Sequence, residues 1–341
     1  MRHTLFATLM IFATALPAAG FEIESDTRFA APSGTTRDEV SILSTADIDL
    51  FAPIVQSFQQ GAPDTDVRYV SVSSSEAMTA VVQDGAAFDL VISSAMDLQT
   101  KLANDGYAAT PQTPATDLVP AWGKWRNSVF AFTQEPAAIV MSRAALEGFE
   151  IPRTRQDLIT LMRDNPERFR NRVGTYDVRD SGLGYLFATQ DSRTSESYWR
   201  LTEVLGSLGL RLYCCSSQMI EDVSAGKLAL AYNVLGSYAA ARDDVQDRII
   251  ILELEDFTTL MLRSVLALKN APNPEGAEAF LAHLLRAAWD DPTGDFPFPN
   301  ASGLGDTVRR PIRLGPGLLV FLDRFKRAQF LQAWEDAVIQ D

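Results

Sequence analysis

Short hydrophobic runs alternate with longer segments of helical periodicity over the first third of the chain. The runs at residues 40–43, 67–72 and 90–92 are rich in Val, Ile and Leu and have the length of buried strands. The segments that follow them are expected to be helices, at residues 47–59, 75–83 and 97–104. Strands that alternate with helices predict a parallel sheet with helices on both faces.

Each of these runs stops in a cluster of hydroxylated residues that begins the next helix. The clusters supply six candidate ligand contacts, namely Ser44, Thr45, Ser74, Ser75, Ser93 and Ser94. A helix start has unpaired N–H groups and a partial positive charge, and the carboxyl ends of parallel strands meet at one edge of a sheet. Helix capping explains any single cluster, because Ser and Thr are favoured there whatever the function. The three clusters together predict a site for a small, negatively charged ligand.

A second α/β unit is expected in the middle of the chain. Its helices are predicted at residues 153–163, 182–190, 195–208 and 218–225, and its strands at 172–176, 228–232 and 249–252. Extended runs enter and leave it, at 128–132 and 137–141 with a hinge near Thr133, and at 260–268. The helices predicted at 274–289 and 319–338 are assigned to the first unit.

The expected fold class is therefore α/β with two lobes, each a mostly parallel sheet flanked by helices, joined by two hinge crossovers. Residues 40–132 and 261–341 are expected to form the first lobe, and residues 133–260 the second. Residues 21–39 are polar and rich in small residues, and are expected to be a linker.

The first twenty residues have the pattern of a secretory signal peptide. Arg2 and His3 precede an apolar stretch at residues 5–16, and small residues end at Gly20. The stretch is shorter than the ~20 residues that a membrane-spanning helix needs. We expect cleavage near Gly20 and a periplasmic location.

The formal net charge of −14 makes nucleic acid an improbable partner. It does not exclude an anionic ligand, because a few donors and one or two arginines inside a cleft set the local field.

The layout resembles the type 2 periplasmic solute-binding proteins of ABC transporters. The amino-acid sequences of residues 90–99 and 226–238 resemble the ferric-ion-binding branch of these proteins. Within that branch they are similar to the phosphoglycerate-transport regulatory and sugar-phosphate-binding members. The resemblance covers nearly the whole mature chain. It implies that the two lobes close over a ligand in the cleft between them.

In such a fold, loops of the second lobe complete the site. They contribute eight further candidates, namely Arg179, Asp180, Ser181, Gly182, Ser216, Ser217, Tyr232 and Asn233. The amides after Asp180 follow a strand and open a helix, so they could surround phosphate or carboxylate oxygens, and Arg179 could add a bidentate contact. The alternative for Arg179 is a solvated surface residue, which is the more frequent case for an arginine on a loop. The alternative for Tyr232 and Asn233 is a strand end that packs on the core.

Cys214 and Cys215 are the chain's two cysteines, and export places them in an oxidising compartment. Adjacent cysteines either close a tight vicinal disulfide or remain two thiols. A disulfide here would offer a small apolar surface to the ligand. Redox catalysis normally needs two spacer residues between the cysteines.

Metal binding is not expected. Iron-binding relatives use adjacent tyrosines just after a segment like 228–233, where this chain has Val234-Leu235-Gly236. Tyr232 and Tyr238 are six residues apart, and His283 is the single histidine beyond the signal. Zinc and copper are not expected either, because the chain has no cluster of His and Cys residues of the kind that their sites require.

The function predicted from the sequence is capture of a phosphorylated or carboxylated solute for an ABC permease. Two alternatives are a co-receptor that presents the liganded form to a sensor histidine kinase, and a ferric-ion carrier. A serine hydrolase is disfavoured, since the chain has no GxSxG elbow and a single candidate base, His283. We therefore expect no enzyme activity, no cofactor and a monomer.

Overall fold

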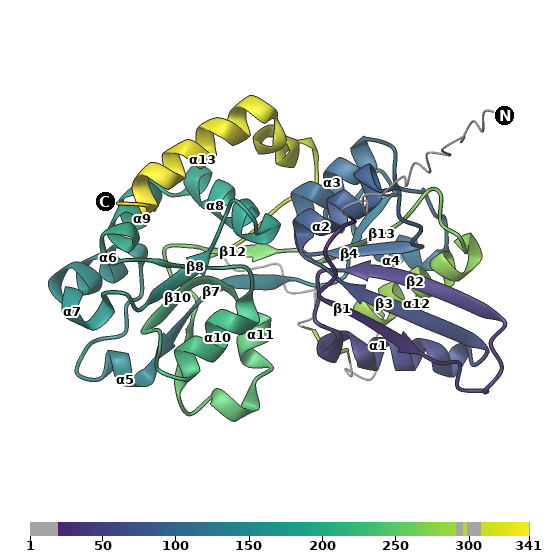
Figure 1. Ribbon diagram of the computed structural model, residues 1–341, viewed down its shortest axis with the longest axis horizontal. Helices are drawn as coiled ribbons and strands as arrows, with labels where there is room; N and C mark the ends of the chain where they lie inside the picture. The colour runs from purple at the N-terminus through teal and green to yellow at the C-terminus, as the bar shows by residue number, and fades with distance from the viewer. Residues whose placement is uncertain (1–19, 291–295, 299–307, 341) are drawn as a thin grey trace, which may run out of the picture.

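A computed structural model describes residues 20–290, 296–298 and 308–340, which form two α/β lobes side by side (Figure 1). The first lobe is built on a seven-stranded sheet in the order β1-β3-β2-β4-β13-β6-β5. Its strands are β1 (Ser25–Phe29), β2 (Asp38–Ser44), β3 (Thr65–Ser71), β4 (Leu90–Ser93), β5 (Lys124–Trp125), β6 (Val129–Ala131) and β13 (Ser264–Ala267). Strands β3, β2 and β4 are parallel, and the others pair antiparallel.

Helices cover both faces of this first sheet. One core holds the apolar residues of α1 (Ile48–Gly61), α4 (Pro114–Leu118) and α12 (Pro274–Trp289). The other core holds those of α2 (Ser74–Met78), the π turn η1 (Thr79–Gln83) and α3 (Met96–Asn104). The starts of α1, α2 and α3 follow the ends of β2, β3 and β4, so they gather at one edge of the sheet (Figure 1).

The second lobe has a sheet in the order β14-β12-β7-β10-β8-β9, and β11 also pairs with β7. Its strands are β7 (Glu135–Ser142), β8 (Val173–Tyr176), β9 (Arg211–Tyr213), β10 (Leu230–Leu235), β11 (Ile249–Leu252), β12 (Thr258–Met261) and β14 (Arg309–Pro311). Helices α8 (Gly182–Thr194), α10 (Ser216–Ser224) and α11 (Gly236–Ala240) share one core. Helices α5 (Arg143–Leu146), α6 (Arg155–Asp164), α7 (Pro166–Phe169) and α9 (Tyr198–Ser207) share the other.

The predicted class, two α/β lobes with helices on both sheet faces, is confirmed. The strand pairing is mixed within each sheet, because β7, β12 and β13, which lie next to the crossovers, pair antiparallel with β10, β7 and β4, while β12 pairs parallel with β14. The chain crosses first between β6 and β7, at Thr133 and Gln134, and again between β12 and β13, at Leu262 and Arg263.

A buried ion pair joins these two crossovers. Arg263 and Glu135 are both fully buried, and Arg263 Nε donates to Glu135 Oε1 at 2.9 Å. Thr133 Oγ1 donates to the same carboxylate at 2.7 Å, and Ser237 Oγ donates to its other oxygen. The crossovers are therefore held together by charge in a site without solvent.

The expectation for residues 21–39 was wrong in part, since β1 lies within them. It pairs antiparallel with β3 at the edge of the first sheet, with alternate residues turned to solvent. Arg68 on β3 donates to Asp26 on β1 at 2.7 Å. A polar, half-exposed edge strand lacks the hydrophobic run by which the central strands were predicted.

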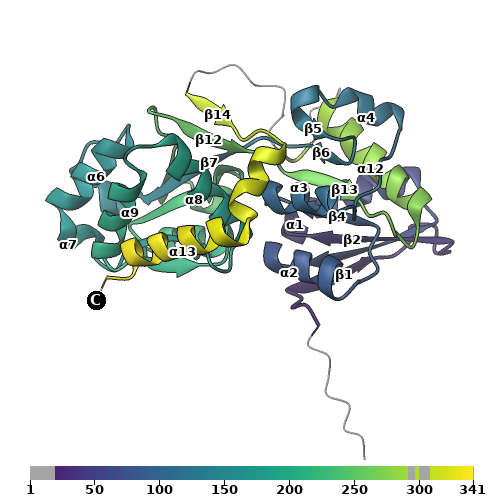
Figure 2. The same ribbon diagram turned by 90° about the horizontal axis from the view of Figure 1, so that it is seen from above.

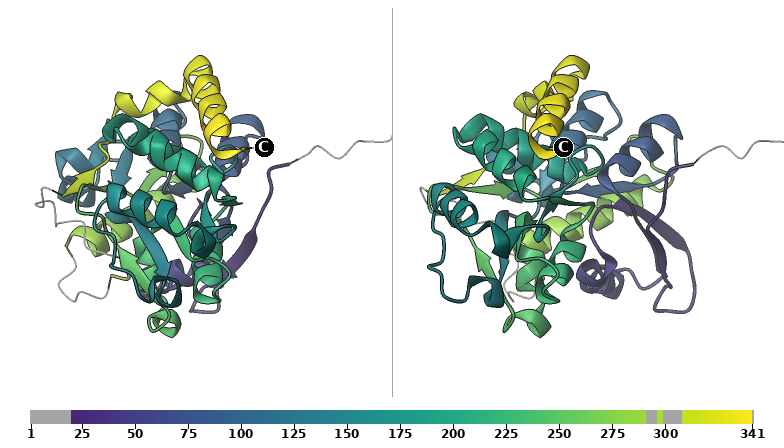
Figure 3. Two further views of the ribbon diagram at one scale, coloured as in Figure 1. Left: turned by 90° about the vertical axis from the view of Figure 1, so that its left-hand side faces the viewer. Right: turned by 60° about the vertical axis from the view of Figure 1, so that its left-hand side comes forward.

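The assignment of residues 261–341 to the first lobe also differs from the structure. The C-terminal helix α13 (Arg324–Val338) lies along the second lobe (Figures 2 and 3), and β14 pairs with β12. Phe330 and Trp334 of α13 are buried in a cluster with Tyr185 and Tyr198 of the second lobe. Burial of these large aromatic side chains outweighs chain proximity to α12.

The helices of the described residues include none with the length and apolar character that crossing a bilayer demands.

Candidate functional site

A cleft of about 700 Å³ lies between the lobes, where the helix starts of both face each other. Helix α1 begins after Asp47, α8 after Ser181 and α10 after Cys215, and all three of these residues line the cleft. Ser73, which precedes α2, lines it too. The positive ends of helices from two lobes therefore converge on one cavity.

Nine of the predicted ligand residues line this cleft. They are Thr45, Ser74, Ser75, Ser94, Arg179, Asp180, Ser181, Ser216 and Ser217. Their contact with a solute remains a prediction, but the structure brings them together from both lobes.

Ser44 and Ser93 do not line the cleft. Ser44 is fully buried and accepts hydrogen bonds from Tyr69 Oη at 2.7 Å and from the Ala46 N–H at 3.0 Å. Ser93 is 3% exposed and accepts from the Ala95 N–H at 3.1 Å. Successive residues at a strand end point to opposite sides, so Thr45 and Ser94 face the cleft while their predecessors fold back onto the chain.

Tyr232 and Asn233 also lie outside the cleft, in a buried network around Asp191. Tyr232 Oη and Asn233 Nδ2 donate to Asp191 Oδ2 at 2.8 and 3.0 Å. Thr259 Oγ1 donates to the other carboxylate oxygen at 3.2 Å. An irregularity in β10 gives Asn233 a φ of 61°, a value that asparagine tolerates better than most residues. The packing interpretation of this strand end is the one that the structure supports.

Gly182 is the fifth predicted residue that does not line the cleft, although it lies at a contact between the lobes. A Cβ at this position would be 2.7 Å from Ser74 Cβ and 3.0 Å from Leu98 Cδ1, both on the first lobe. Glycine is therefore required for close approach of α8 to α2 and α3.

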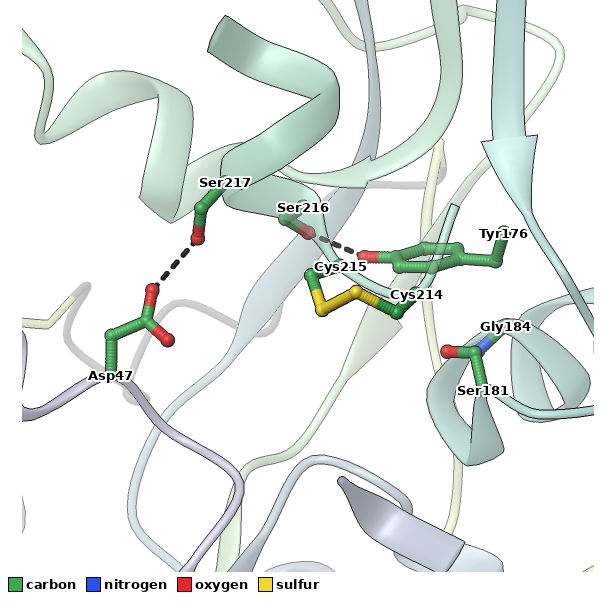
Figure 4. Close-up of a disulfide and its surroundings, with 8 residues drawn as sticks. All are labelled: Asp47, Tyr176, Ser181, Gly184, Cys214, Cys215, Ser216 and Ser217. Atoms are coloured by element: carbon green, nitrogen blue, oxygen red, sulfur yellow. Dashed lines mark hydrogen bonds between the residues drawn. A yellow bond between two sulfur atoms is a disulfide. The ribbon is translucent and has the colours of Figure 1, made fainter. Parts of the chain in front are cut away.

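Hydrogen bonds across the cleft show that the lobes are closed on each other. Ser217 Oγ donates to Asp47 Oδ2 at 2.7 Å (Figure 4), and Ser75 Oγ donates to the Asp180 carbonyl at 2.9 Å. The Asp47 N–H donates to Tyr238 Oη at 3.3 Å.

Cys214 and Cys215 form a disulfide in the structure, and both line the cleft (Figure 4). Next to them, Ser216 shares a hydrogen bond with Tyr176 Oη, and the Leu235 N–H donates to Ser216 Oγ at 3.1 Å. The disulfide thus lies at the start of α10, where, with Leu183 and Leu235, it adds apolar surface to a wall that also presents hydroxyl groups.

The charges of the cleft are unevenly placed. Carboxylates of Glu22, Glu24, Asp47 and Glu76 line its first-lobe side, by the start of β1 and the ends of β2 and β3, where the Glu22 N–H donates to Glu76 Oε2 at 2.8 Å, and Asp180 lines its second-lobe side before α8. Burial, with the charges of Asp47 and Glu22, raises the pKa of Glu24. Two arginines, Arg179 and Arg327, line the cleft beside α8. Sequence reasoning missed Arg327, because α13 was assigned to the first lobe.

Asp97, in the first turn of α3, is 3% exposed, and its burial raises its pKa to about 7 against an ordinary value of 3.8. A folded-state pKa above the unfolded value means that stability falls as pH rises from about 4 to about 7, as the folded protein loses a proton that burial favours. In urea unfolding at pH 8, the unfolding free energy of Asp97→Asn should therefore exceed that of the parent by about 2–4 kcal/mol. Near pH 4 the two proteins should be equally stable. A parent stability that does not change between pH 5 and 8 would contradict this origin.

Among the described residues, no group of three or more His, Cys, Asp or Glu side chains is placed to hold a metal ion.

The chain's relatives agree with this architecture. The sequence profile of the family described as bacterial extracellular solute-binding protein matches residues 44–291. The crystal structure of the substrate-binding protein of an ABC transporter from Agrobacterium tumefaciens is 31% identical, with a TM-score of 0.85 over 92% of this chain and 98% of that one. No curated protein sequence was found to match.

More distant structures share the fold. The periplasmic binding protein AfuA from Actinobacillus pleuropneumoniae, with fructose-6-phosphate bound, has 14% identity and a TM-score of 0.70 over 90% of this chain and all of that one. Iron-bound HitA from Pseudomonas aeruginosa has 13% identity and a TM-score of 0.66 over 88% and 99%.

Two α/β lobes closed over a polar cleft define a binding protein of the periplasmic type. The chain belongs to the bacterial extracellular solute-binding proteins, and the resemblance seen in its sequence is confirmed.

Proposed function

We propose that this protein is the periplasmic binding component of an ABC importer and that its solute is a small anion with a phosphate or carboxylate group. The observation that carries the proposal is the meeting of helix N-termini from both lobes with Arg179 and Arg327 in one cleft. Each helix start offers N–H groups and about half a positive charge to an anion. The fructose-6-phosphate bound to the neighbour AfuA supports a phosphorylated solute.

A ferric ion suits this cleft less well. Ferric iron needs several anionic oxygen or nitrogen ligands around one point, and the described residues contain no such cluster. The two tyrosines of the cleft are already engaged, Tyr176 with Ser216 and Tyr238 with the Asp47 N–H. A binding function, as opposed to catalysis, is supported by membership of the extracellular solute-binding family and by hydrogen-bond donors on both walls of the cleft.

Closure gives such a protein its function. A solute that contacts both walls makes all of its contacts only in the closed form. Its binding therefore increases the fraction of protein molecules in that form. The closed form is then what a permease would recognise.

The first experiment is mass spectrometry of metabolites released from the purified protein, followed by calorimetry with the compounds found. A released set without any phosphate or carboxylate compound would contradict the anionic solute while leaving the transport role in place.

Substitutions in the second-lobe wall should weaken binding of the identified solute. Arg179→Ala and Ser181→Ala are each expected to lower affinity about tenfold, because each removes a donor or charge at the start of α8. Arg200→Ala, at an exposed site on α9, is the matched control and should bind normally. Unchanged affinity in both cleft variants would remove these positions from the site.

A further inference from the structure

The C-terminal segment reaches both lobes before it ends. The 3-10 turn η4 (Pro316–Leu322) packs against α3 of the first lobe, and α13 then packs against α9 of the second (Figure 2). Helix α13 starts beside the cleft, which Arg327 of its first turn lines, and Asp323 caps it by accepting from the Phe325 and Lys326 N–H groups at 3.1 Å. The first turns of α13 are thus fixed beside the cleft.

Arg327 projects from this start and lines the cleft. Its guanidinium lies 4.5 Å from the ring centroid of Tyr185, and its Nη2 donates to the Arg179 carbonyl at 3.4 Å. Tyr185 is itself held, since its Oη donates to the Phe321 carbonyl at 2.6 Å. Stacking on a fixed ring holds a guanidinium in place without neutralising its charge.

The two arginines of the cleft differ in what balances them. Arg179 makes a bidentate pair with Asp177, with Nε to Oδ1 at 2.8 Å and Nη2 to Oδ2 at 2.5 Å. Among the described residues, no carboxylate pairs with the Arg327 guanidinium within 4.0 Å, and the buried Asp97 carboxyl, on which the charge of Arg327 acts, is farther away. The positive charge available to a solute on this side of the cleft therefore comes chiefly from Arg327.

The acidic residues on the first-lobe side of the cleft limit where the charged end of an anionic solute can bind. An anion near Glu22, Glu24 or Asp47 would meet like charge without a nearby cation among the described lining residues. Beside Arg327 it would meet two guanidinium groups and the start of α8, with Asp180 as the lining carboxylate of that side. The favourable place for the charged end of the solute is thus confined to one corner.

We infer that Arg327 is the principal anion-binding residue of the cleft and that the C-terminal helix brings it there to hold the phosphate or carboxylate of the solute. The inference rests on the proposed function, because it assigns the charged end of that solute to one corner. It gives α13 a part in recognition in addition to its packing on the second lobe.

The test is calorimetry of the parent, Arg327→Gln, Arg327→Lys and Arg324→Gln with two pairs of probes, glucose 6-phosphate with glucose and 3-phosphoglycerate with glycerate. Arg324 is exposed on the same helix and serves as the control. For a probe that the parent binds, Arg327→Gln should lower affinity about 10- to 100-fold, the range for a charge-assisted contact, and should reduce the salt dependence of binding. Arg327→Lys should retain part of the affinity, since it keeps the charge but loses the planar fork.

Urea unfolding of each variant separates loss of binding from loss of folding. Affinity of Arg327→Gln within twofold of the parent for an anionic probe would overturn the inference and leave the proposed function standing. Failure of the parent to bind any of the three anionic probes, or equal binding of glucose and glucose 6-phosphate, would overturn both the inference and the anionic solute. A loss shared equally by Arg324→Gln would overturn the inference alone.

Discussion

Replacing Gly182 by valine is expected to abolish tight solute binding while both lobes stay folded. A Cβ at this position would lie 2.7 Å from Ser74 Cβ across the interface between the lobes, so a larger side chain keeps α8 away from α2. The overlap exists in the closed form alone, because the two residues belong to different lobes. Overpacking of about 3 kcal/mol would lower affinity roughly 100-fold.

Calorimetry with the released solute measures the affinity of Gly182→Val, and small-angle X-ray scattering reports whether the protein still contracts when solute is added. Gly61→Val is the matched control, since Gly61 at the end of α1 has open space around it. In a second test, Gly182→Ala, which adds a single Cβ, should have an affinity between those of the parent and Gly182→Val. Normal binding by Gly182→Val would show that the lobes do not meet here in the liganded protein.

Replacing Arg263 by methionine is expected to cost about 3–5 kcal/mol of unfolding free energy, the usual penalty for leaving one member of a buried ion pair without its partner. Glu135 would remain in a site without solvent, with the Thr133 and Ser237 hydroxyls as its remaining donors. The effect should appear in urea unfolding and should be larger than that of any surface substitution.

The pH dependence gives this prediction its sign. In the parent, burial raises the pKa of Glu135, but Arg263 outweighs burial and holds the pKa below its ordinary value. The pair therefore adds stability above the ordinary glutamate pKa and loses it as pH falls. In Arg263→Met only the Thr133 and Ser237 hydroxyls oppose the effect of burial, so the pKa of Glu135 should rise and the stability deficit relative to the parent should grow from pH 4 to pH 8.

The double variant Arg263→Met with Glu135→Gln should recover most of the lost stability, because it removes the uncompensated charge as well. A loss below 1 kcal/mol in the single variant would show that solvent reaches Glu135 once Arg263 is gone.

Sequence reasoning found the central strands because their burial on both sides leaves continuous runs of branched apolar residues, as at β2 and β4. It found the starts of α8 and α10 because hydroxylated and small residues mark such starts. It missed β1, whose alternation is polar and half-exposed, since edge strands depend on pairing partners far along the chain.

The candidate site divided in the same way. The pattern of hydroxyl clusters predicted which turns meet at the cleft, and nine of fourteen candidate residues line it. It did not predict which residue of a Ser-Thr or Ser-Ser pair faces the cleft. Side chains at a strand end alternate in direction, so a shift of one position along the chain turns the side chain to the other side.

The sequence by itself determined the α/β class, the two lobes and the hydroxyl-rich helix starts, because these follow from periodicity and from residues adjacent in the chain. The tertiary structure alone decided that α13 packs on the second lobe and places Arg327 at the cleft, and that Gly182 lies against Ser74. It also decided that Tyr232 and Asn233 donate hydrogen bonds to the buried Asp191 and lie outside the cleft. These contacts join residues from about forty to more than one hundred positions apart. They depend on the packing of whole helices and on the pairing of buried polar groups, for which no local pattern in the chain provides a signal.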